Sequence, residues 1–211
     1  MLGFMTNPRR SAAALLIVVT AAALAGCDAY AAPSEPTATA VGSSPATPSS
    51  SPTAEPVTLP TECADLVAPE VYAVTFFNAP LNDPLIAADY PLGSLAPTPP
   101  ADGATPGETV ASATELRCLW RDPAADVTYL QVELARVDTA TSTAYLGSLP
   151  GDGYTCADVD NGFRCQIVGT SPLYPVEEAT TVFVRDDVVI TISQASFPTT
   201  NLLGEITGGI W

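Results

Sequence analysis

The sequence predicts an α+β fold: an antiparallel sheet of about five strands with flanking helices and two disulfides. Three observations support this prediction. In residues 59–211, segments with helical spacing of apolar residues are interspersed with segments that alternate apolar and polar residues one by one. Asparagine, aspartate and glycine turn signals join neighbouring strand segments into hairpins. The same region holds four cysteines, an even number that suits disulfides in an exported chain.

The domain begins with a helical segment and a long loop. Apolar residues recur at near-helical spacing over residues 63–77, where Pro69 divides the segment into a short helix and a second turn. Residues 80–107 contain seven prolines and little periodicity, so we expect a loop that extends to about residue 110, with a brief helical piece at 85–88. Binding residues favour loops, so this loop is the best place for function by position alone; a disordered insertion is the alternative.

Strand patterns dominate the rest of the domain. The clearest alternation lies in residues 127–137, which a hairpin loop at 121–126 joins to a short strand at 116–120. Asp138 is the expected N-cap of a helix that runs to residue 146. The other expected elements are strands at 163–168, 179–185 and 188–194, the last two joined through Arg185, Asp186 and Asp187, and a closing helix capped by Thr199, Thr200 and Asn201 and ended by Gly208 and Gly209. We assign the strand aromatics to the core: Trp120, Tyr129 and Phe183.

The cysteine spacing predicts two disulfides. Cys156 and Cys165 flank an Asn-Gly turn signal, so a short loop closed by its own disulfide is the simplest interpretation. Cys63 then pairs with Cys118. The entropy model assigns about 3 kcal/mol to the short loop and about 4 kcal/mol to the long one. A thiolate metal site would need Cys-x-x-Cys spacing or histidines, and the sequence has neither, so we expect no metal and no cofactor.

The first 26 residues have the pattern that predicts an export signal. Arg9 and Arg10 precede an apolar run of about 14 residues, too short to span a bilayer as a helix. The run ends in Leu-Ala-Gly at residues 24–26, directly before Cys27, and Met1 and Met5 are alternative starts. This pattern resembles that of bacterial lipoproteins, which implies cleavage before Cys27 and diacylation of its sulfur. An ordinary secreted protein with a chance cysteine is the alternative.

Residues 27–58 predict a flexible tether, because they consist mostly of Ala, Pro, Ser and Thr. Such a stretch buries too little apolar area to offset its ordering entropy, and its prolines favour extended polyproline II structure. Thirty-odd residues can then hold the domain up to roughly 100 Å from a membrane. Signal and tether together predict a protein on the extracytoplasmic face of the cell membrane.

Charge and composition exclude several functions. The whole chain carries a net charge of −16; all 23 acidic residues and five of the seven arginines follow Cys27, so the processed chain would carry −18. This charge repels phosphate backbones, and we expect no nucleic-acid partner. The chain contains no histidine and no lysine, which removes the usual general base, the usual activator of serine or cysteine, and Schiff-base chemistry.

Three patterns invite a chemical interpretation. Residues 158–162 resemble part of a calcium loop, but the glycine falls one position early and the disulfide loop is too short for a calcium cage, so we interpret them as a turn. The adjacent acids Glu177-Glu178 and Asp186-Asp187 point in different directions on a strand, whereas a glycosidase needs converging carboxyls. Ser94 and Ser148 lack a nucleophile-elbow frame and a histidine to activate them. We therefore assign no catalytic residue.

The layout of lipobox, Pro-Thr linker and two disulfides resembles the small disulfide-paired lipoproteins of actinobacteria. More distantly it is similar to the extracellular sensor domain of mycobacterial receptor Ser/Thr kinases. The residues concerned are Cys63 in an early helix, Cys118 and Trp120 on one strand, Tyr129 on the next, and the final hairpin with its helix. Most of this family has no known function, so the resemblance implies a fold more than an activity.

Three classes of function fit these observations. The first is a non-catalytic binding or interaction module at the cell surface, held to the membrane through a lipid at Cys27. Its partner would be a cell-wall, transport or signalling protein, and its oligomeric state is open. The second is a ligand sensor or carrier with an apolar pocket between sheet and helices. The third is a hydrolase that uses carboxylates only.

The lipobox generates the first prediction. Replacing Cys27 by Ala should remove the lipid, so that the protein either stays unprocessed or is shed into the medium. Membrane fractionation with mass spectrometry of the N-terminus measures both outcomes. A Cys27→Ala protein that has lost its signal segment and still partitions with membranes would show that the lipobox interpretation is wrong.

Overall fold

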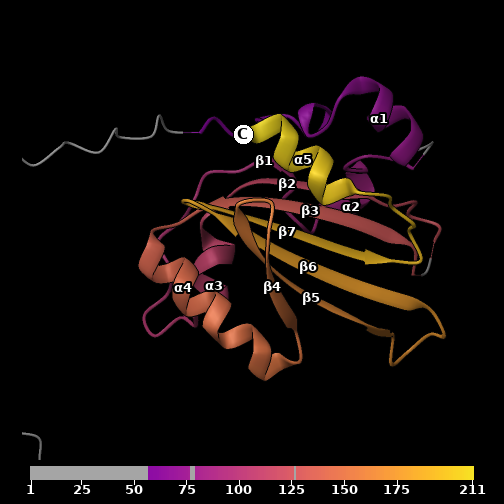
Figure 1. The fold of residues 1–211 in the computed structure, drawn as a ribbon. Helices are drawn as coiled ribbons and strands as arrows, with labels where there is room; N and C mark the ends of the chain where they lie inside the picture. Colours follow the sequence, from indigo (N-terminus) through magenta and orange to yellow (C-terminus); the bar gives the residue numbers. More distant parts are fainter. Residues whose placement is uncertain (1–56, 77–78, 126) are drawn as a thin grey trace, which may run out of the picture. The chain divides into compact units, whose positions relative to one another are not determined.

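The computed structural model describes residues 57–76, 79–125 and 127–211 (Figure 1). Cys27, the signal segment and nearly all of the tether lie outside these residues. In the described part, no helix has the length and apolar character that crossing a membrane requires.

One antiparallel sheet organises the domain. Its strand order is β1-β2-β3-β7-β6-β5-β4, and every neighbouring pair is antiparallel. The α+β class is confirmed, but the expected number of about five strands is wrong, because the sheet has seven. The strands are β1 (Gly93–Ser94), β2 (Thr114–Trp120), β3 (Tyr129–Arg136), β4 (Thr155–Val159), β5 (Gly162–Thr170), β6 (Glu177–Arg185) and β7 (Val188–Ala195).

Two of the strands, β1 and β4, were not predicted from the sequence. β4 occupies part of the segment expected to be a simple loop closed by a disulfide, and it pairs with β5 so that Cys156 lies opposite Cys165. Asp160 and Asn161 form the two-residue turn between them, and their φ values of 49° and 59° suit the right-handed twist of a hairpin. β4 is mostly exposed, so it lacks the alternation of a half-buried strand. β1 is two residues long, which is too short for any periodicity.

Helices flank the sheet. They are the 3-10 helix η1 (Cys63–Asp65), α1 (Pro69–Thr75), α2 (Pro84–Ala87), α3 (Pro106–Ser112), α4 (Thr139–Ser148), the 3-10 helix η2 (Leu149–Asp152) and α5 (Leu202–Ile210). The break before Pro69 and the short helix in the long loop are as expected. The expected loop up to residue 110 is wrong at its end, where α3 forms. Pro106 occupies the first turn of that helix, where a proline is tolerated, and Thr105 and Glu108 cap it reciprocally.

The other helix ends give mixed outcomes. Asp138 is the N-cap of α4, and its carboxylate accepts a hydrogen bond of 2.7 Å from the Thr141 N–H. This bond to the charged form lowers the pKa of Asp138. α5 begins after Asn201 as expected, but Asn201 has a φ of 52° and its side chain makes no capping bond. The helix also continues through Gly208 and Gly209, so the expected stop there is wrong.

Each face of the sheet carries its own core. On the first face, α1 and α5 cover β2, β3 and β7 (Figure 1). The Phe76 ring stacks on the Trp120 ring there, with 4.0 Å between the ring centroids. On the second face, α3 and α4 cover a cluster that includes Cys165, Val182 and Val189. The buried positions of Trp120 and Phe183 confirm their assignment to the core.

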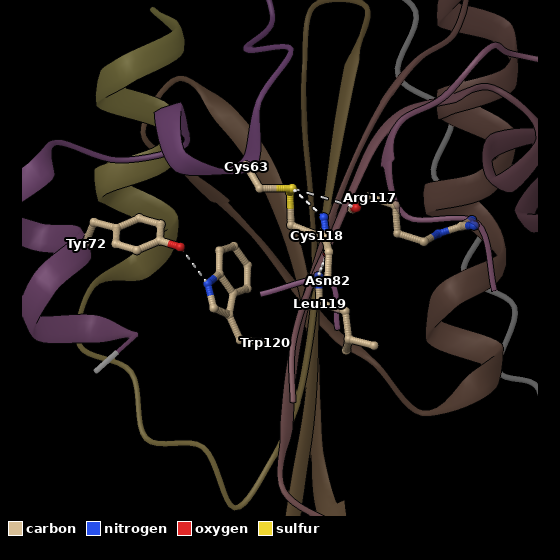
Figure 2. Close-up of a disulfide and its surroundings, with 7 residues drawn as sticks. All are labelled: Cys63, Tyr72, Asn82, Arg117, Cys118, Leu119 and Trp120. Carbon is tan, nitrogen blue, oxygen red and sulfur yellow. Dashed lines mark hydrogen bonds between the residues drawn. A yellow bond between two sulfur atoms is a disulfide. The ribbon is translucent and has the colours of Figure 1, made fainter. Parts of the chain in front are cut away.

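The two disulfides pair as expected. Cys156–Cys165 crosses the β4–β5 hairpin, and Cys63–Cys118 ties η1 to β2. Figure 2 shows the second bond beside Trp120, whose indole N–H donates a hydrogen bond of 3.1 Å to the Tyr72 hydroxyl. The disulfide therefore fixes η1 covalently to the side of β2 that faces the core.

The long loop lies along the outer edge of β2. The Asn82 N–H donates to the Leu119 carbonyl at 2.8 Å, and the Leu119 N–H donates back to the Asn82 side-chain oxygen at 2.9 Å (Figure 2). The Asn82 amide also donates to Cys63 Sγ at 3.5 Å. Further along, β1 pairs with Leu116 and Arg117. These bonds hold the intervening residues beside the sheet and satisfy an edge that would otherwise be open.

A close contact in the β4–β5 hairpin gives the second prediction. A Cβ at Gly162 would lie 2.3 Å from the Phe183 ring and 2.7 Å from the Val184 carbonyl oxygen. Gly162→Ala should therefore lower the free energy of unfolding by about 1–3 kcal/mol. Gly169→Ala is the matched control on the same strand, because a Cβ there meets no atom within 4 Å. Urea denaturation measures both, and equal stabilities of the two variants would contradict the prediction.

Candidate functional site

Some of the described arginines form ion pairs with carboxylates, and others do not. Arg117 pairs with Glu133, Arg136 with Asp187, and Arg185 with Asp186. Within the described residues, the two other arginines, Arg121 and Arg164, form no ion pair with a carboxylate. In a chain with 23 acidic residues, an arginine that lines a hollow without such a partner is a candidate ligand-binding group.

Arg121 lines a hollow of about 430 Å³ on the second face of the sheet. Its volume lies in the range of small-molecule sites. We call it the Arg121 hollow, and its lining residues are Ile86, Tyr90, Leu119, Arg121, Tyr129, Gln131 and Ser193.

Three strands build the floor of the Arg121 hollow. Leu119 of β2, Gln131 of β3 and Ser193 of β7 are direct neighbours across the sheet, so their side chains share one face. Tyr129 lies two residues before Gln131 and therefore on the same face. The register of β2, β3 and β7 thus sets the floor without any contribution from a flexible segment.

The wall of the Arg121 hollow comes from α2 and the residues that follow it. Tyr90 is held from two sides: the Arg117 guanidinium lies 4.6 Å from its ring centroid, and the Gln131 amide donates to its hydroxyl at 3.3 Å. Arg117 is fixed in turn by Glu133 and by the Pro91 carbonyl, to which it donates at 3.2 Å. A wall held by such contacts needs little ordering when a ligand binds.

Arg121 has an unused donor. Its Nε is buried and, among the described residues, is the one buried side-chain nitrogen or oxygen without a hydrogen-bond partner. Its Nη2 makes one long bond, 3.4 Å, to the Ala125 carbonyl. Its backbone is fixed, because its N–H donates to the Pro80 carbonyl at 3.0 Å. A buried guanidinium N–H without an acceptor is costly, so this group is suited to a ligand that brings one.

Tyr129 stays protonated in the hollow. Burial raises the pKa of its phenol, and the negative charge of Glu178 raises it further, while Arg121 opposes the shift. Tyr129 was expected to be a core residue, and this is wrong: its side chain is partly exposed because it lines the hollow. Its hydroxyl can therefore both donate and accept at neutral pH.

The patterns that the sequence singled out lie elsewhere. Residues 158–162 form the tight turn between β4 and β5, as interpreted. The two acidic pairs lie at opposite ends of β6. Asp187 pairs with Arg136 at 2.6 Å, and Asp186 accepts a bond from the Trp211 indole at 3.1 Å. Within the described residues, no group of three or more potential metal ligands comes together.

The sequence did not point to Ile86, Tyr90, Arg121, Gln131 or Ser193 individually. One signal was available: arginine is scarce in this chain, so an arginine without a carboxylate partner stands out as a candidate ligand-binding group. The long loop, favoured for function by position, contributes Ile86 and Tyr90 to the hollow. Comparisons with protein-family models, with curated proteins and with solved structures find no match for this chain.

The environment of Tyr129 gives the third prediction. Its phenol should ionise above pH 10, because the folded protein disfavours the phenolate through burial and the nearby Glu178. The difference between the ultraviolet absorbance titrations of the wild type and of Tyr129→Phe isolates this residue. A difference curve with its midpoint below pH 10 would contradict the described environment.

Proposed function

We propose that this protein is a lipoprotein of the extracytoplasmic membrane face, anchored through Cys27, whose domain is a non-catalytic binding module. Its site is the Arg121 hollow, and its ligand is a small carboxylate with an apolar or aromatic body. A cell-wall, transport or signalling protein is the proposed partner that uses the bound ligand.

The observation that carries this proposal is the unpartnered Nε of Arg121 at the edge of a preformed hollow. A guanidinium offers adjacent N–H donors in one plane, and a carboxylate accepts two of them together. A neutral ligand would leave the positive charge of Arg121 uncompensated. The chemistry of the donor therefore favours an anion with two oxygens in one plane.

The rest of the lining favours an apolar body for that ligand. Ile86 and Leu119 provide aliphatic surface, and Tyr90 and Tyr129 provide rings with polar tips. Gln131 and Ser193 add neutral hydrogen-bonding groups on the floor. A hollow that combines aliphatic and aromatic surface with several polar groups can fix the orientation of a small molecule.

The same lining supports binding rather than catalysis. Ser193 is the one hydroxyl there besides the tyrosines, and its oxygen lies 3.5 Å from the Thr180 hydroxyl, not beside a base. The raised pKa of Tyr129 makes its phenolate, the form that acts as a base or nucleophile, less accessible than that of a free tyrosine. With no histidine or lysine in the chain, the hollow lacks the groups that usually activate a nucleophile.

The tight packing of side chains between the sheet and its helices favours the Arg121 hollow as the ligand site over a pocket in the core. Trp120, Phe183 and Ile206 are fully buried where α1 and α5 cover the first face. On the second face, Val182 and Cys165 are fully buried under α3 and α4. Side chains packed at this density leave little room for a ligand. A carrier of an apolar ligand would need these layers to separate.

Binding of phenylacetate to the full chain tests the proposal and is the fourth prediction. Isothermal titration calorimetry should show that phenylacetate binds at least about tenfold more tightly than phenylacetamide, because a charge-assisted hydrogen bond contributes roughly 1.5–3 kcal/mol. Arg121→Gln should reduce the affinity for phenylacetate by a similar factor. Arg121→Lys should recover part of the loss, since it restores the charge but not the planar pair of donors.

Arg185→Gln is the matched control. It removes one positive charge from the other end of the sheet, where Arg185 faces Asp186 and the Trp211 ring, and should leave the affinity unchanged. Equal affinities for phenylacetate and phenylacetamide, or an Arg121→Gln variant that binds as the wild type does, would overturn the assignment of the hollow.

A further inference from the structure

We propose a second binding site on the first face of the sheet, around Arg164, that takes a saccharide carrying a carboxylate. It is independent of the Arg121 hollow, which lies on the opposite face. The site is a hollow of about 280 Å³, which we call the Arg164 trough. Its polar and charged lining residues are Asp160, Arg164, Gln166, Thr181, Gln194, Thr199 and Asn201.

The strand register places these side chains together. Gln166 of β5 lies opposite Thr181 of β6, which lies opposite Ile192 of β7. Arg164 is two residues before Gln166 and therefore shares its face. Arg164 lies opposite Phe183, whose ring belongs to the core of the first face, so the trough begins where that core ends.

The position of Arg164 distinguishes the trough from an ordinary solvated sheet face. Polar residues are normal on the open side of an antiparallel sheet. Arg164, however, is partly buried in a hollow, and it forms no ion pair with a carboxylate in the described ranges, although Asp160 lies on the same lining. An adjoining hollow of about 340 Å³ shares Arg164 and Gln166, so the arginine lies between two open spaces.

The hydrogen bonds in the trough leave a mixed set of donors and acceptors. Gln166 uses its Nε2 to donate to Thr181 at 3.1 Å, so its side-chain oxygen faces no described partner. The Gln194 side-chain oxygen accepts a hydrogen bond of 3.1 Å from the Thr199 hydroxyl, so the Nε2 of Gln194 is the group that can donate to a ligand. A sugar hydroxyl both donates and accepts, and it suits neighbouring groups of both kinds.

Besides hydroxyl groups, the ligand should carry an anionic group, because Arg164 is positively charged. A carboxylate matches the planar guanidinium and would lie beside the amides that receive the hydroxyls. Asp160, in the turn that leads into β5, also lines the trough; it repels a second anionic group and can accept a hydrogen bond from a hydroxyl instead. Together these groups select a polyhydroxylated ring with one carboxylate over a neutral sugar or a multiply charged anion.

Titration of the full chain with galacturonate tests this site, with galactose as the neutral match, and is the fifth prediction. Calorimetry should show galacturonate binding at least about tenfold more tightly than galactose, because the charge-assisted bond is lost in the neutral sugar. Arg164→Gln should reduce galacturonate affinity by a similar factor. Thr181→Val, which removes the acceptor that orients Gln166, should weaken galacturonate and galactose equally.

Two controls separate this site from the Arg121 hollow and from general charge. Saturating phenylacetate should leave the galacturonate affinity unchanged, because the two sites lie on opposite faces. Arg136→Gln, which removes a positive charge from β3, three strands away from β5, should also leave it unchanged. Competition between the two ligands, unaltered binding by a folded Arg164→Gln variant, or no galacturonate binding up to about 10 mM would overturn the proposal.

Discussion

The structure depends on how β2 is fixed between the core and the long loop. Cys118 forms its disulfide to η1, and Trp120 packs under Phe76, so both point to the first face. Because strand residues alternate, Leu119 between them must point to the second face, and there it forms part of the floor of the Arg121 hollow. Figure 2 shows the same alternation in Trp120 and Arg117, which extend to opposite sides of the strand. The disulfide and the aromatic stack therefore fix the orientation of β2, and the strand register then places Gln131 and Ser193 beside Leu119 in the proposed site.

The three paired arginines each hold a peripheral segment against the sheet. Arg117 holds Tyr90 and Pro91 of the long loop. Arg136 of β3 donates to the Val57 carbonyl at 2.8 Å, and so holds the first described residue. Arg185 lies 4.8 Å from the centroid of the Trp211 ring, at the last residue. Scarce positive charge thus serves structure in three places, and the two remaining arginines line hollows on opposite faces.

The sequence predicted the parts of the fold that have a strong local cause. Alternation located the long strands, the Asn-Gly signal located the β4–β5 turn and with it both disulfides, and Asp138 marked the start of α4. It did not predict β4, because a strand exposed on both sides has no alternation of apolar and polar residues. It did not predict α3, because a proline in the first turn of a helix, such as Pro106, cannot be told from a proline in a loop by sequence. The candidate site was less predictable still. Whether Arg121 has a partner depends on contacts between β2, the loop and β3, and Tyr129 differs from a core aromatic only through the hollow beside it.

The disulfide from Cys63 to Cys118 also determines how the domain would respond to mechanical tension. A pull applied at residue 57 and resisted at the C-terminus travels six residues along the backbone to Cys63 and then crosses the sulfur–sulfur bond directly to β2. Residues 64–117 lie in a covalent loop that carries none of that load. Ile86 and Tyr90, the wall of the Arg121 hollow, belong to this loop. A force carried along this path would therefore spare Ile86 and Tyr90 and act on the floor of the hollow, because Leu119, Arg121, Tyr129, Gln131 and Ser193 lie outside the loop.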